Sequence, residues 1–353
     1  MSNQVQAFLI RAYPAPDHVL YHEFQTAKIV IYVGEDDRNK SLVLAKEKLA
    51  EEKWIPIGFE SKSTLIEDRV REEGGPAWQA YNSAKSGEIF FRHFLEEDFL
   101  YSRKAGISPM LPPRITEKFI DEVIQKAGGH RLTMEEANPD ETRNPDYRIE
   151  NYLIELKDLQ KEGLNIESRR KKLAKLLNES GGAESFNERD YAKYLDILGG
   201  PIKGKVRDAA HQIRQAKEYI GDNIIKGGLL YLNTGYYTLP HDIFCQIVEK
   251  MSQKYQSEIN LVMCISNMVN TNGFESMINF EFYPGKGENS VESKVHSAFL
   301  SQVMKLMNDW AKEGFKNSSN PAEIRKPYIF ENDGEYYGFE PKSLECSANK
   351  RKE

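Results

Sequence analysis

The sequence predicts an α/β protein built around a mixed sheet, and two observations carry that prediction. First, amphipathic, helix-like segments separate the apolar runs at 227–235 and 259–267, as in parallel strands joined by crossover helices. Second, three extended segments follow one another closely at 130–137, 146–150 and 151–159, with a very short turn between the last two. Such a turn is typical of an antiparallel hairpin, so the sheet is expected to contain both kinds of pairing.

Residues 1–107 are predicted to form a separate N-terminal α/β module. Ser41 is the expected N-cap of its first helix. The strands are expected at 7–13, 27–33 and 55–59, and the helices at 41–54, 63–75 and 76–87. The segment SPMLPPR (108–114) marks a linker, because its prolines interrupt regular structure. A second domain is therefore expected over 108–353, and the module before the linker shows no catalytic constellation.

The second domain is expected to open with a helix over 115–127, which Thr116 caps and Gly128 ends. A basic insertion is predicted at about 160–206, and it contains a basic helix and an expected flexible loop at 199–205. Both a solvated helix face and a phosphate-contacting surface are consistent with the charges of this helix. The residues assigned to nucleic-acid contact are Arg169, Arg170, Lys171 and Lys172.

The composition indicates a folded, water-soluble chain. Hydrophobic residues make up 40% of the 353 residues and charged residues 29%, which is typical of globular domains. No apolar run approaches the roughly 20 residues of a membrane span, and the start lacks the pattern of a signal peptide. A cytoplasmic location without membrane contact is therefore expected. The net charge of −6 disfavours a protein that coats nucleic acid broadly, although basic residues can still cluster locally.

Several common types of site are disfavoured by the sequence. The cysteines Cys245, Cys264 and Cys346 are scattered and odd in number, which argues against a disulfide framework or a zinc cage. Cys264 lies within an apolar run and is expected to be a small core residue. The histidines show no metal-binding spacing, and neither a P-loop nor a G-x-S-x-G nucleophile motif occurs.

The stretch NPDYRIENYLIELKDL (144–159) carries the candidate chemistry. Side chains alternate along a strand, so Glu155 and Lys157 project from one face and Leu156 from the other. If the hairpin forms, Asp146 lies near its open end and approaches Glu155. Two carboxylates and an ammonium group so placed suit Mg²⁺, which prefers carboxylates, water and phosphate oxygens. The backbone carbonyl of Leu156 is a further expected ligand, and Lys157 is expected to orient the attacking water.

A simpler interpretation of Glu155 and Lys157 is a cross-strand ion pair on a solvent-facing sheet, worth at most about 1 kcal/mol. The apolar residues of YLIEL (152–156) around them argue against it, because charges within such a run usually have a partner or a function.

Pro145-Asp146, followed by Glu155-Leu156-Lys157, resembles the signature of the PD-(D/E)XK nuclease superfamily. The resemblance covers roughly residues 112–270. It implies a restriction-endonuclease-like core in the order helix, three antiparallel strands, helix and further strand, with the aspartate opening the second strand and the E-x-K triplet on the third. Asp140 also follows a proline but belongs to a polar loop, so Asp146 is the expected metal ligand.

The same resemblance implies auxiliary residues around the metal. A polar residue of the second core helix often joins the site, and Gln212 and Gln215 are the candidates. A glutamate of the first helix often joins it too, and here Glu117 and Glu122 are both available. The expected catalytic set is Asp146, Glu155, Lys157, Gln212 and Gln215, and the expected metal ligands are Asp146, Glu155 and Leu156.

The expected activity is hydrolysis of phosphodiester bonds with Mg²⁺ or Mn²⁺, on DNA rather than RNA. Cutting both strands with one site per chain calls for two copies, so a homodimer is expected. By analogy, the fused module suggests an effector of a prokaryotic antiviral defence or restriction system that acts with a sensor or ATPase partner. The contrasting hypothesis is a catalytically silent subunit that binds nucleic acid or protein on the same fold.

Overall fold

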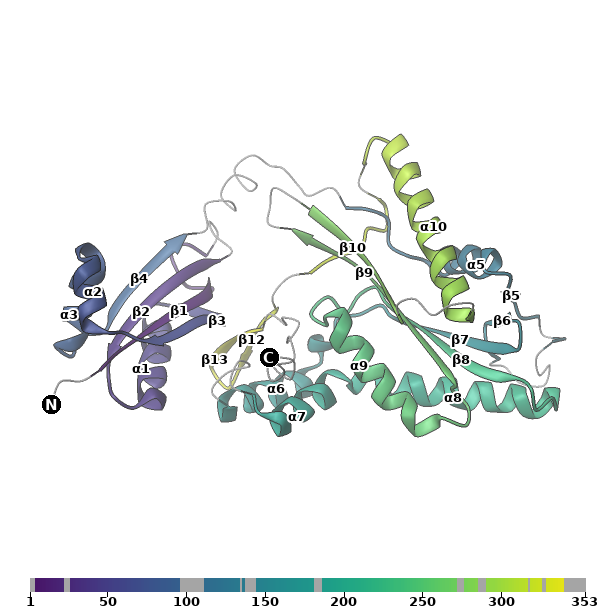
Figure 1. Cartoon of the computed structure of the whole chain (residues 1–353), viewed down its shortest axis with the longest axis horizontal. Coiled ribbons are helices and arrows are strands. Elements are labelled where there is room, and N and C mark those ends of the chain that lie inside the picture. The colour runs from purple at the N-terminus through teal and green to yellow at the C-terminus, as the bar shows by residue number, and fades with distance from the viewer. Residues whose placement is uncertain are drawn as a thin grey trace.

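The computed structural model describes residues 4–21, 26–95, 111–133, 135–136, 144–180, 186–271, 276–284, 290–316, 318–325 and 328–339. The chain has a mixed α/β structure with a small N-terminal sheet and a larger central sheet (Figure 1). Within the described ranges, no helix combines the length and the apolar character that crossing a bilayer requires.

The N-terminal module is an antiparallel sheet with the strand order β3-β1-β2-β4. Its strands are β1 (Val5–Pro14), β2 (Ala27–Gly34), β3 (Trp54–Thr64) and β4 (Phe90–Leu95), and its helices are α1 (Arg38–Glu51), α2 (Glu67–Glu73) and α3 (Gly75–Lys85). Phe8, Ile10 and Ile29 are fully buried on the sheet face that packs against α1. The module therefore has a hydrophobic core of its own.

The helix predicted over 41–54 starts and ends earlier than expected. Asp37, not Ser41, is its N-cap, because the Asp37 carboxylate accepts two hydrogen bonds from backbone N–H groups of the first turn, at 2.7 and 3.2 Å. Trp54 opens β3, and this strand continues to Thr64, into a segment predicted to be helical. β4 lies where no strand was predicted.

The central sheet has the strand order β10-β9-β8-β7-β6-β5, and β11 pairs with β9. Its strands are β5 (His130–Arg131), β6 (Tyr147–Ile149), β7 (Tyr152–Leu159), β8 (Lys226–Asn233), β9 (Leu261–Thr271), β10 (Ser276–Tyr283) and β11 (Glu323–Ile324). β5, β6 and β7 pair antiparallel, and β7, β8 and β9 pair parallel. The predicted hairpin is confirmed, since Ile149 pairs with Tyr152 and Glu150 adopts a φ of 51° in the turn.

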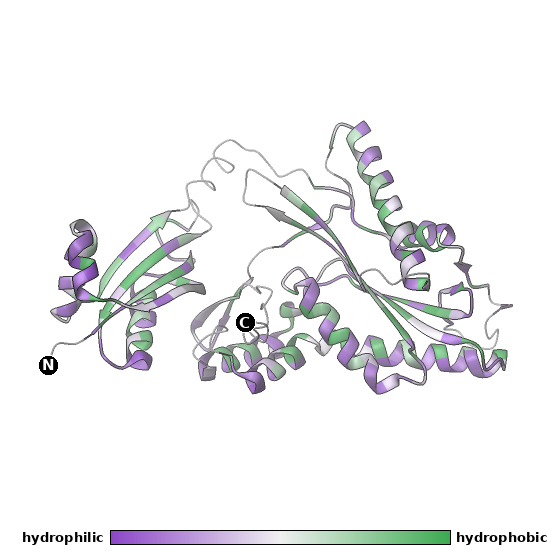
Figure 2. Cartoon of the chain, in the orientation of Figure 1, coloured by the Kyte–Doolittle hydropathy of each residue, from purple (hydrophilic) through white to green (hydrophobic). Residues whose placement is uncertain are grey.

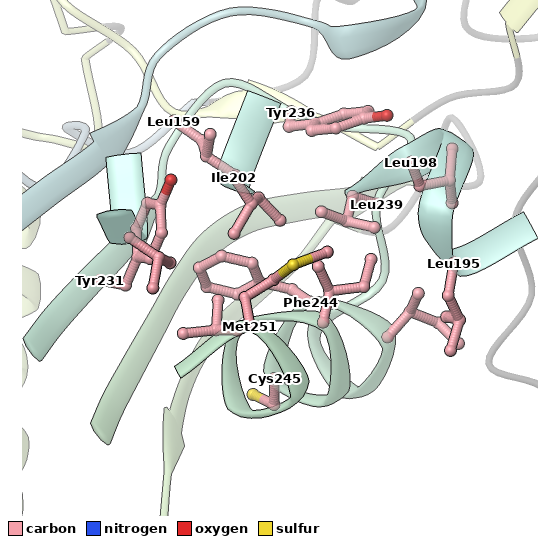
Figure 3. Close-up of a cluster of buried hydrophobic side chains, with 14 of the residues drawn as sticks. Leu159, Leu195, Leu198, Ile202, Tyr231, Tyr236, Leu239, Phe244, Cys245 and Met251 are labelled. Carbon is pink, nitrogen blue, oxygen red and sulfur yellow. The ribbon is translucent and has the colours of Figure 1, made fainter. Parts of the chain in front are cut away.

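Helices cover both faces of the central sheet. α8 (Gly200–Ile220) and α9 (His241–Ser252) pack against one face, and α5 (Glu117–Lys126) and α10 (Val291–Lys312) pack against the other. On the first face Tyr231 of β8 packs edge-on against Phe244 of α9, with ring centroids 5.4 Å apart (Figure 3). In Figure 2 the strands β8 and β9 are largely apolar, whereas the helices alternate in hydropathy. One side of each helix therefore faces the sheet and the other faces water.

The predicted insertion is helical and closes the α8 and α9 side of the core. It contains the single turn η1 (Gly163–Asn165) and the helices α6 (Glu167–Ser180) and α7 (Glu188–Leu198); another single turn, η3 (Gln253–Tyr255), follows α9. The loop predicted at 199–205 is wrong, because residues 200–205 form the first turns of α8. Pro201 stands in the first turn, where proline favours a helix start, and Ile202 is buried.

The hairpin of β12 (Tyr328–Asn332) and β13 (Glu335–Phe339) lies where the N-terminal module meets the rest of the chain. Phe330 and Phe339 add to the core formed by α6, α7 and α9. Gly338 packs against β3 so closely that a Cβ atom there would lie 2.7 Å from the carbonyl oxygen of Pro56. Glycine at this position therefore permits the contact.

Two further predicted segments differ from the structure. Of the strand predicted over 130–137, only β5 is regular, and a turn follows in the described part of that segment. The described end of the predicted linker, 111–114, packs on the second domain, where Pro113 pairs with Pro321 and Arg114 Nη2 lies 2.6 Å from Glu323 Oε1. Residues 108–110 lie outside the described residues.

Helix α5 begins as predicted at an N-cap threonine. The Thr116 hydroxyl accepts a hydrogen bond from the Phe119 N–H at 3.3 Å. We expect Thr116→Ala to lower the free energy of unfolding by about 1 kcal/mol, because one N–H of the first turn loses its acceptor. Thr116→Ser keeps an acceptor and should stay close to the wild type. Urea denaturation measures both, and equal losses in the two variants would contradict the capping role.

Candidate active site

Glu155 and Lys157 lie on β7 and face α8, as the alternation of the strand predicts. The Lys157 ammonium donates to the Glu155 carboxylate. It also donates to Gln212 Oε1 of α8 at 2.9 Å. Glu155 is only 2% exposed, so this contact lies within the protein and is not a surface ion pair.

Asp146 lies beside these groups, immediately before β6. Its N–H donates to the carbonyl of Ile154 at 3.1 Å, and its Oδ2 accepts from the Leu156 N–H at 2.8 Å. The backbone of β7 therefore holds Asp146 at two points. The register that pairs Tyr147 with Ile154 places Asp146 level with Glu155, as the sequence predicted.

The two carboxyl groups are in an environment that opposes their joint ionisation. Burial first, and then the neighbouring Asp146 carboxylate, raise the pKa of Glu155 to about 8. Burial also raises the pKa of Asp146, although the Leu156 N–H and Lys157 act in the opposite direction. Glu155 Oε2 is buried and accepts no hydrogen bond within the described ranges, and a proton on Glu155 would be shared with Asp146. A bound cation would replace that proton, because it would remove the repulsion between the two carboxylates and give Oε2 a positively charged partner.

The backbone of Leu156 fits the ligand role that the sequence suggested. The N–H and C=O groups of one strand residue point to the same edge of the strand. The Leu156 N–H donates to Asp146, so the carbonyl of Leu156 points toward the same edge of β7, the edge along which β6 pairs. At that point β6 has not yet begun, because its first residue, Tyr147, pairs with Ile154. Two carboxylates and a carbonyl oxygen form a donor set that Mg²⁺ accepts together with water.

No group of three or more His, Cys, Asp or Glu side chains able to share a metal ion occurs among the residues that the structure describes. A metal at Asp146 and Glu155 would therefore depend on the Leu156 carbonyl and on water for its remaining ligands.

The structure shows a contact for one of the two candidate glutamines and separates the two candidate glutamates. Gln212 bonds to Lys157, and Gln215 is half-buried nearly one turn further along α8, where its role stays a prediction. Glu122 faces α10, where it accepts hydrogen bonds from Gln302 and from Lys305, the latter at 2.9 Å. Glu117 is the nearer glutamate, since its charge raises the pKa of Asp146.

An arginine that the sequence analysis missed stands beside Asp146. Arg131 of β5 donates to Glu117, to Asp121 at 2.8 Å and to the Tyr147 hydroxyl at 3.2 Å. Its positive charge lowers the pKa of Asp146 and thus opposes the effect of burial. The arginine follows a histidine in a two-residue strand, and no motif in the sequence signals its place near the site.

The basic residues assigned to nucleic-acid contact divide into two pairs. Arg169 and Arg170 are half-buried, and they donate to backbone carbonyls of the η1 segment. Their guanidinium groups therefore hold the chain between β7 and α6. Lys171 and Lys172 are exposed, and Lys171 pairs with Glu167 at 2.8 Å. These two lysines are the members of the set that face solvent.

No family model, no curated protein and no solved structure matches this chain.

Proposed function

We propose that this chain is a metal-dependent nuclease that hydrolyses phosphodiester bonds on a restriction-endonuclease-like core. The observation that carries the proposal is the grouping of Asp146, Glu155, Lys157 and Gln212 at one point of the central sheet, with the buried Glu155 Oε2 left without a donor among the described atoms. The elements α5, β5, β6, β7, α8 and β8 follow one another in this order, with η1, α6 and α7 inserted between β7 and α8, and this supports the proposal, because the resemblance to PD-(D/E)XK enzymes implies the same order for the core.

The residues present fit a hard divalent cation. The carboxylates of Asp146 and Glu155 and the carbonyl of Leu156 would hold Mg²⁺ or Mn²⁺, which supplies Lewis-acid stabilisation of the phosphate and a more acidic water. Lys157 keeps its ammonium group beside these carboxylates, where it orients the attacking water and offsets the negative charge that develops on the phosphate. Gln212 accepts from that ammonium group and fixes its position.

DNA is the proposed substrate, and RNA is the alternative that the assay includes. The exposed Lys171 and Lys172 are the proposed backbone contacts, and the net charge of −6 favours such local contact over broad coating. We further propose a cytoplasmic homodimer that acts as a defence or restriction effector with a sensor or ATPase partner. This setting rests on analogy with other fused nucleases.

A cleavage assay tests the proposal. Plasmid, linear duplex, single-stranded DNA and RNA are incubated with the protein and Mg²⁺, Mn²⁺ or EDTA, beside Lys157→Ala. Cleavage that requires the metal and disappears in the variant supports the proposal. Cleavage that survives EDTA or the loss of Lys157 would show that another site or a contaminant is responsible.

Gln212→Ala is expected to slow cleavage about 10- to 100-fold, the usual range for a group that orients a catalytic residue. In this variant the Lys157 ammonium group keeps its hydrogen bond to Glu155 but loses the Gln212 oxygen that accepts its second hydrogen bond. The variant should bind Mn²⁺ as the wild type does, because Gln212 is not a proposed ligand. Glu218→Ala, at an exposed position of the same helix, is the control, and an equal loss of activity in both variants would contradict the assignment.

A catalytically silent binding subunit is the second candidate function. Two features favour it. The Lys157 ammonium group already pairs with the Glu155 carboxylate in place of a metal, and the net charge of −6 disfavours broad contact with nucleic acid. A silent subunit should show no thermal shift with Mg²⁺ or Mn²⁺ that Asp146→Ala abolishes. A shift of that kind would favour the nuclease instead.

A further inference from the structure

A second cluster of reactive side chains lies on the same face of the central sheet as the candidate active site. Cys245 belongs to α9 and Cys264 to β9, and both are part of the core between that helix and the sheet (Figure 3 labels Cys245). His241 lies one turn before Cys245, with its Nε2 atom 3.4 Å from Cys245 Sγ. Its Nδ1 atom lies 2.8 Å from Ser266 Oγ. The imidazole therefore bridges a thiol and a hydroxyl.

The surroundings of the two thiols make them unequal. Hydrogen bonding with Cys264, and to a smaller extent the contact with His241, lower the pKa of Cys245 to about 7 despite its burial. Burial raises the pKa of Cys264 well above its usual value. At neutral pH the cluster therefore combines a nucleophilic thiolate with a neighbouring neutral thiol, as peroxide-sensing cysteine pairs require.

We propose that Cys245 and Cys264 form a peroxide-sensitive thiol pair, in which Cys245 is oxidised first and Cys264 resolves it to a disulfide. This modification site goes beyond the proposed nuclease and does not depend on it. The disulfides that do form in a reducing compartment are usually transient and redox-sensing, and the proposed Cys245–Cys264 bond is of that kind. Hydrogen peroxide is the proposed oxidant, because Cys245 is only 5% exposed and the site would therefore take a small neutral molecule.

The chemistry proceeds in two balanced steps. The Cys245 thiolate attacks one oxygen of hydrogen peroxide, so that an S–O bond forms and the O–O bond breaks. The sulfur loses two electrons, the peroxide gains them, and the departing hydroxide leaves as water with the proton of the Cys245 thiol, which His241 Nε2 relays. Cys264 then attacks the Cys245 sulfur, the S–S bond forms, and the second hydroxide leaves as water with the Cys264 proton.

The cluster is connected to the candidate active site by cross-strand neighbours. Cys264 on β9 lies opposite Tyr231 on β8, and Tyr231 lies opposite Lys157 on β7. Neighbours in register share one face of a sheet. The thiol pair therefore lies two strands from the proposed catalytic lysine, within the same packed layer.

Peptide mapping of the full-length protein tests the proposal without any assay of nuclease activity. The reduced protein is treated with hydrogen peroxide in native buffer, and its cysteine peptides are identified by mass spectrometry. We expect a Cys245–Cys264 disulfide and an intact mass lower by two hydrogen atoms. In Cys264→Ser the disulfide should be lost, and dimedone should trap a sulfenic acid at Cys245.

Cys346→Ser is the control, and it should form the disulfide as the wild type does. His241→Asn should slow the oxidation of Cys245, because the thiolate loses its imidazole partner. Disulfides that join Cys346, or a Cys245 that reacts with peroxide no faster than Cys346 in the wild-type protein, would overturn the proposal. The wild-type comparison decides the matter even if a variant does not fold.

Discussion

Replacing Glu155 with Gln is expected to abolish metal-dependent cleavage while leaving the metal-free protein as stable as the wild type. At neutral pH the raised pKa keeps the Glu155 carboxyl largely protonated in the absence of a metal, and Gln has nearly the same shape and no charge. The free energy of unfolding should therefore change by less than about 1 kcal/mol. Activity should fall by about 10³-fold or more, because a preorganised charge at the reacting phosphate is lost.

Glu162 provides a matched control, because it is a second buried carboxyl group whose pKa burial also raises, but both of its oxygens accept hydrogen bonds. Its Oε1 accepts from the Leu164 N–H at 2.8 Å and the Thr238 hydroxyl at 2.7 Å, and its Oε2 accepts from the Thr238 N–H at 3.1 Å. An amide in Glu162→Gln would turn an NH₂ group toward one of these donors. We expect a loss of about 1–3 kcal/mol in stability with cleavage retained.

The comparison separates a functional carboxylate from a structural one. Denaturation curves and cleavage rates are measured for both variants, together with the thermal shift that Mn²⁺ produces. The nuclease proposal requires that Glu155→Gln lose the cleavage and the shift together and that Glu162→Gln lose neither. If Glu155→Gln is instead the destabilised variant and keeps its cleavage, Glu155 is a structural residue and the proposed metal site is wrong.

The parts of the site that lie on one hairpin could be predicted from the sequence. Because side chains alternate along a strand, Glu155 and Lys157 lie on one face of β7. The two-residue turn sets the register of the hairpin, and the register determines which residue on the β6 side lies opposite each residue of β7. These are local relations, so no knowledge of the rest of the fold is needed. The same is true of the N-cap at Thr116, where the side chain contacts its own first turn.

Contacts between distant elements could not be predicted in this way. Gln212 and Gln215 are both polar residues of α8, and only the rotation of the helix against β7 brings Gln212 to Lys157. Glu122 was an equal candidate to Glu117 until α10, which the sequence analysis did not place, provided its partners. Distances between elements follow from packing, and a pattern in the sequence does not contain them.

The basic run of α6 shows a different limit. Arg169 donates to the carbonyl of Gly163, and Arg170 donates to the carbonyls of Leu164 and Asn165 at 3.3 and 3.1 Å. An arginine that binds carbonyl groups of its own chain has the same sequence signature as one that binds phosphate. Charge alone therefore predicts a phosphate-contacting surface made of all four residues. In the structure, only Lys171 and Lys172 of the four are exposed.

The contribution of Glu155 to the stability of the metal-free protein is expected to fall as the pH rises from about 4.5 to about 8. The Glu155 carboxyl has a pKa near 4.5 in an unfolded chain and about 8 in the folded protein. Between these values the folded state binds a proton that the unfolded state has released, so raising the pH favours unfolding. The decrease from this group is at most about 1.4 kcal/mol for each pH unit, and it ends above the folded pKa. Asp146, whose pKa is also raised, acts in the same direction.

A divalent cation should oppose this decrease, because it binds the deprotonated carboxylates and not the protonated ones. Urea denaturation between pH 5 and pH 8.5 therefore should show a larger stabilisation by Mg²⁺ at the alkaline end, by the logic of linked proton and metal binding. Without metal, Glu155→Gln should lose less stability than the wild type as the pH rises across this range, and Mg²⁺ should no longer change its pH dependence. A variant whose pH dependence equals that of the wild type would mean that Glu155 ionises in the folded protein without a metal. The buried carboxylate would then be satisfied by Lys157 alone, and the argument that its charge requires a cation would fail.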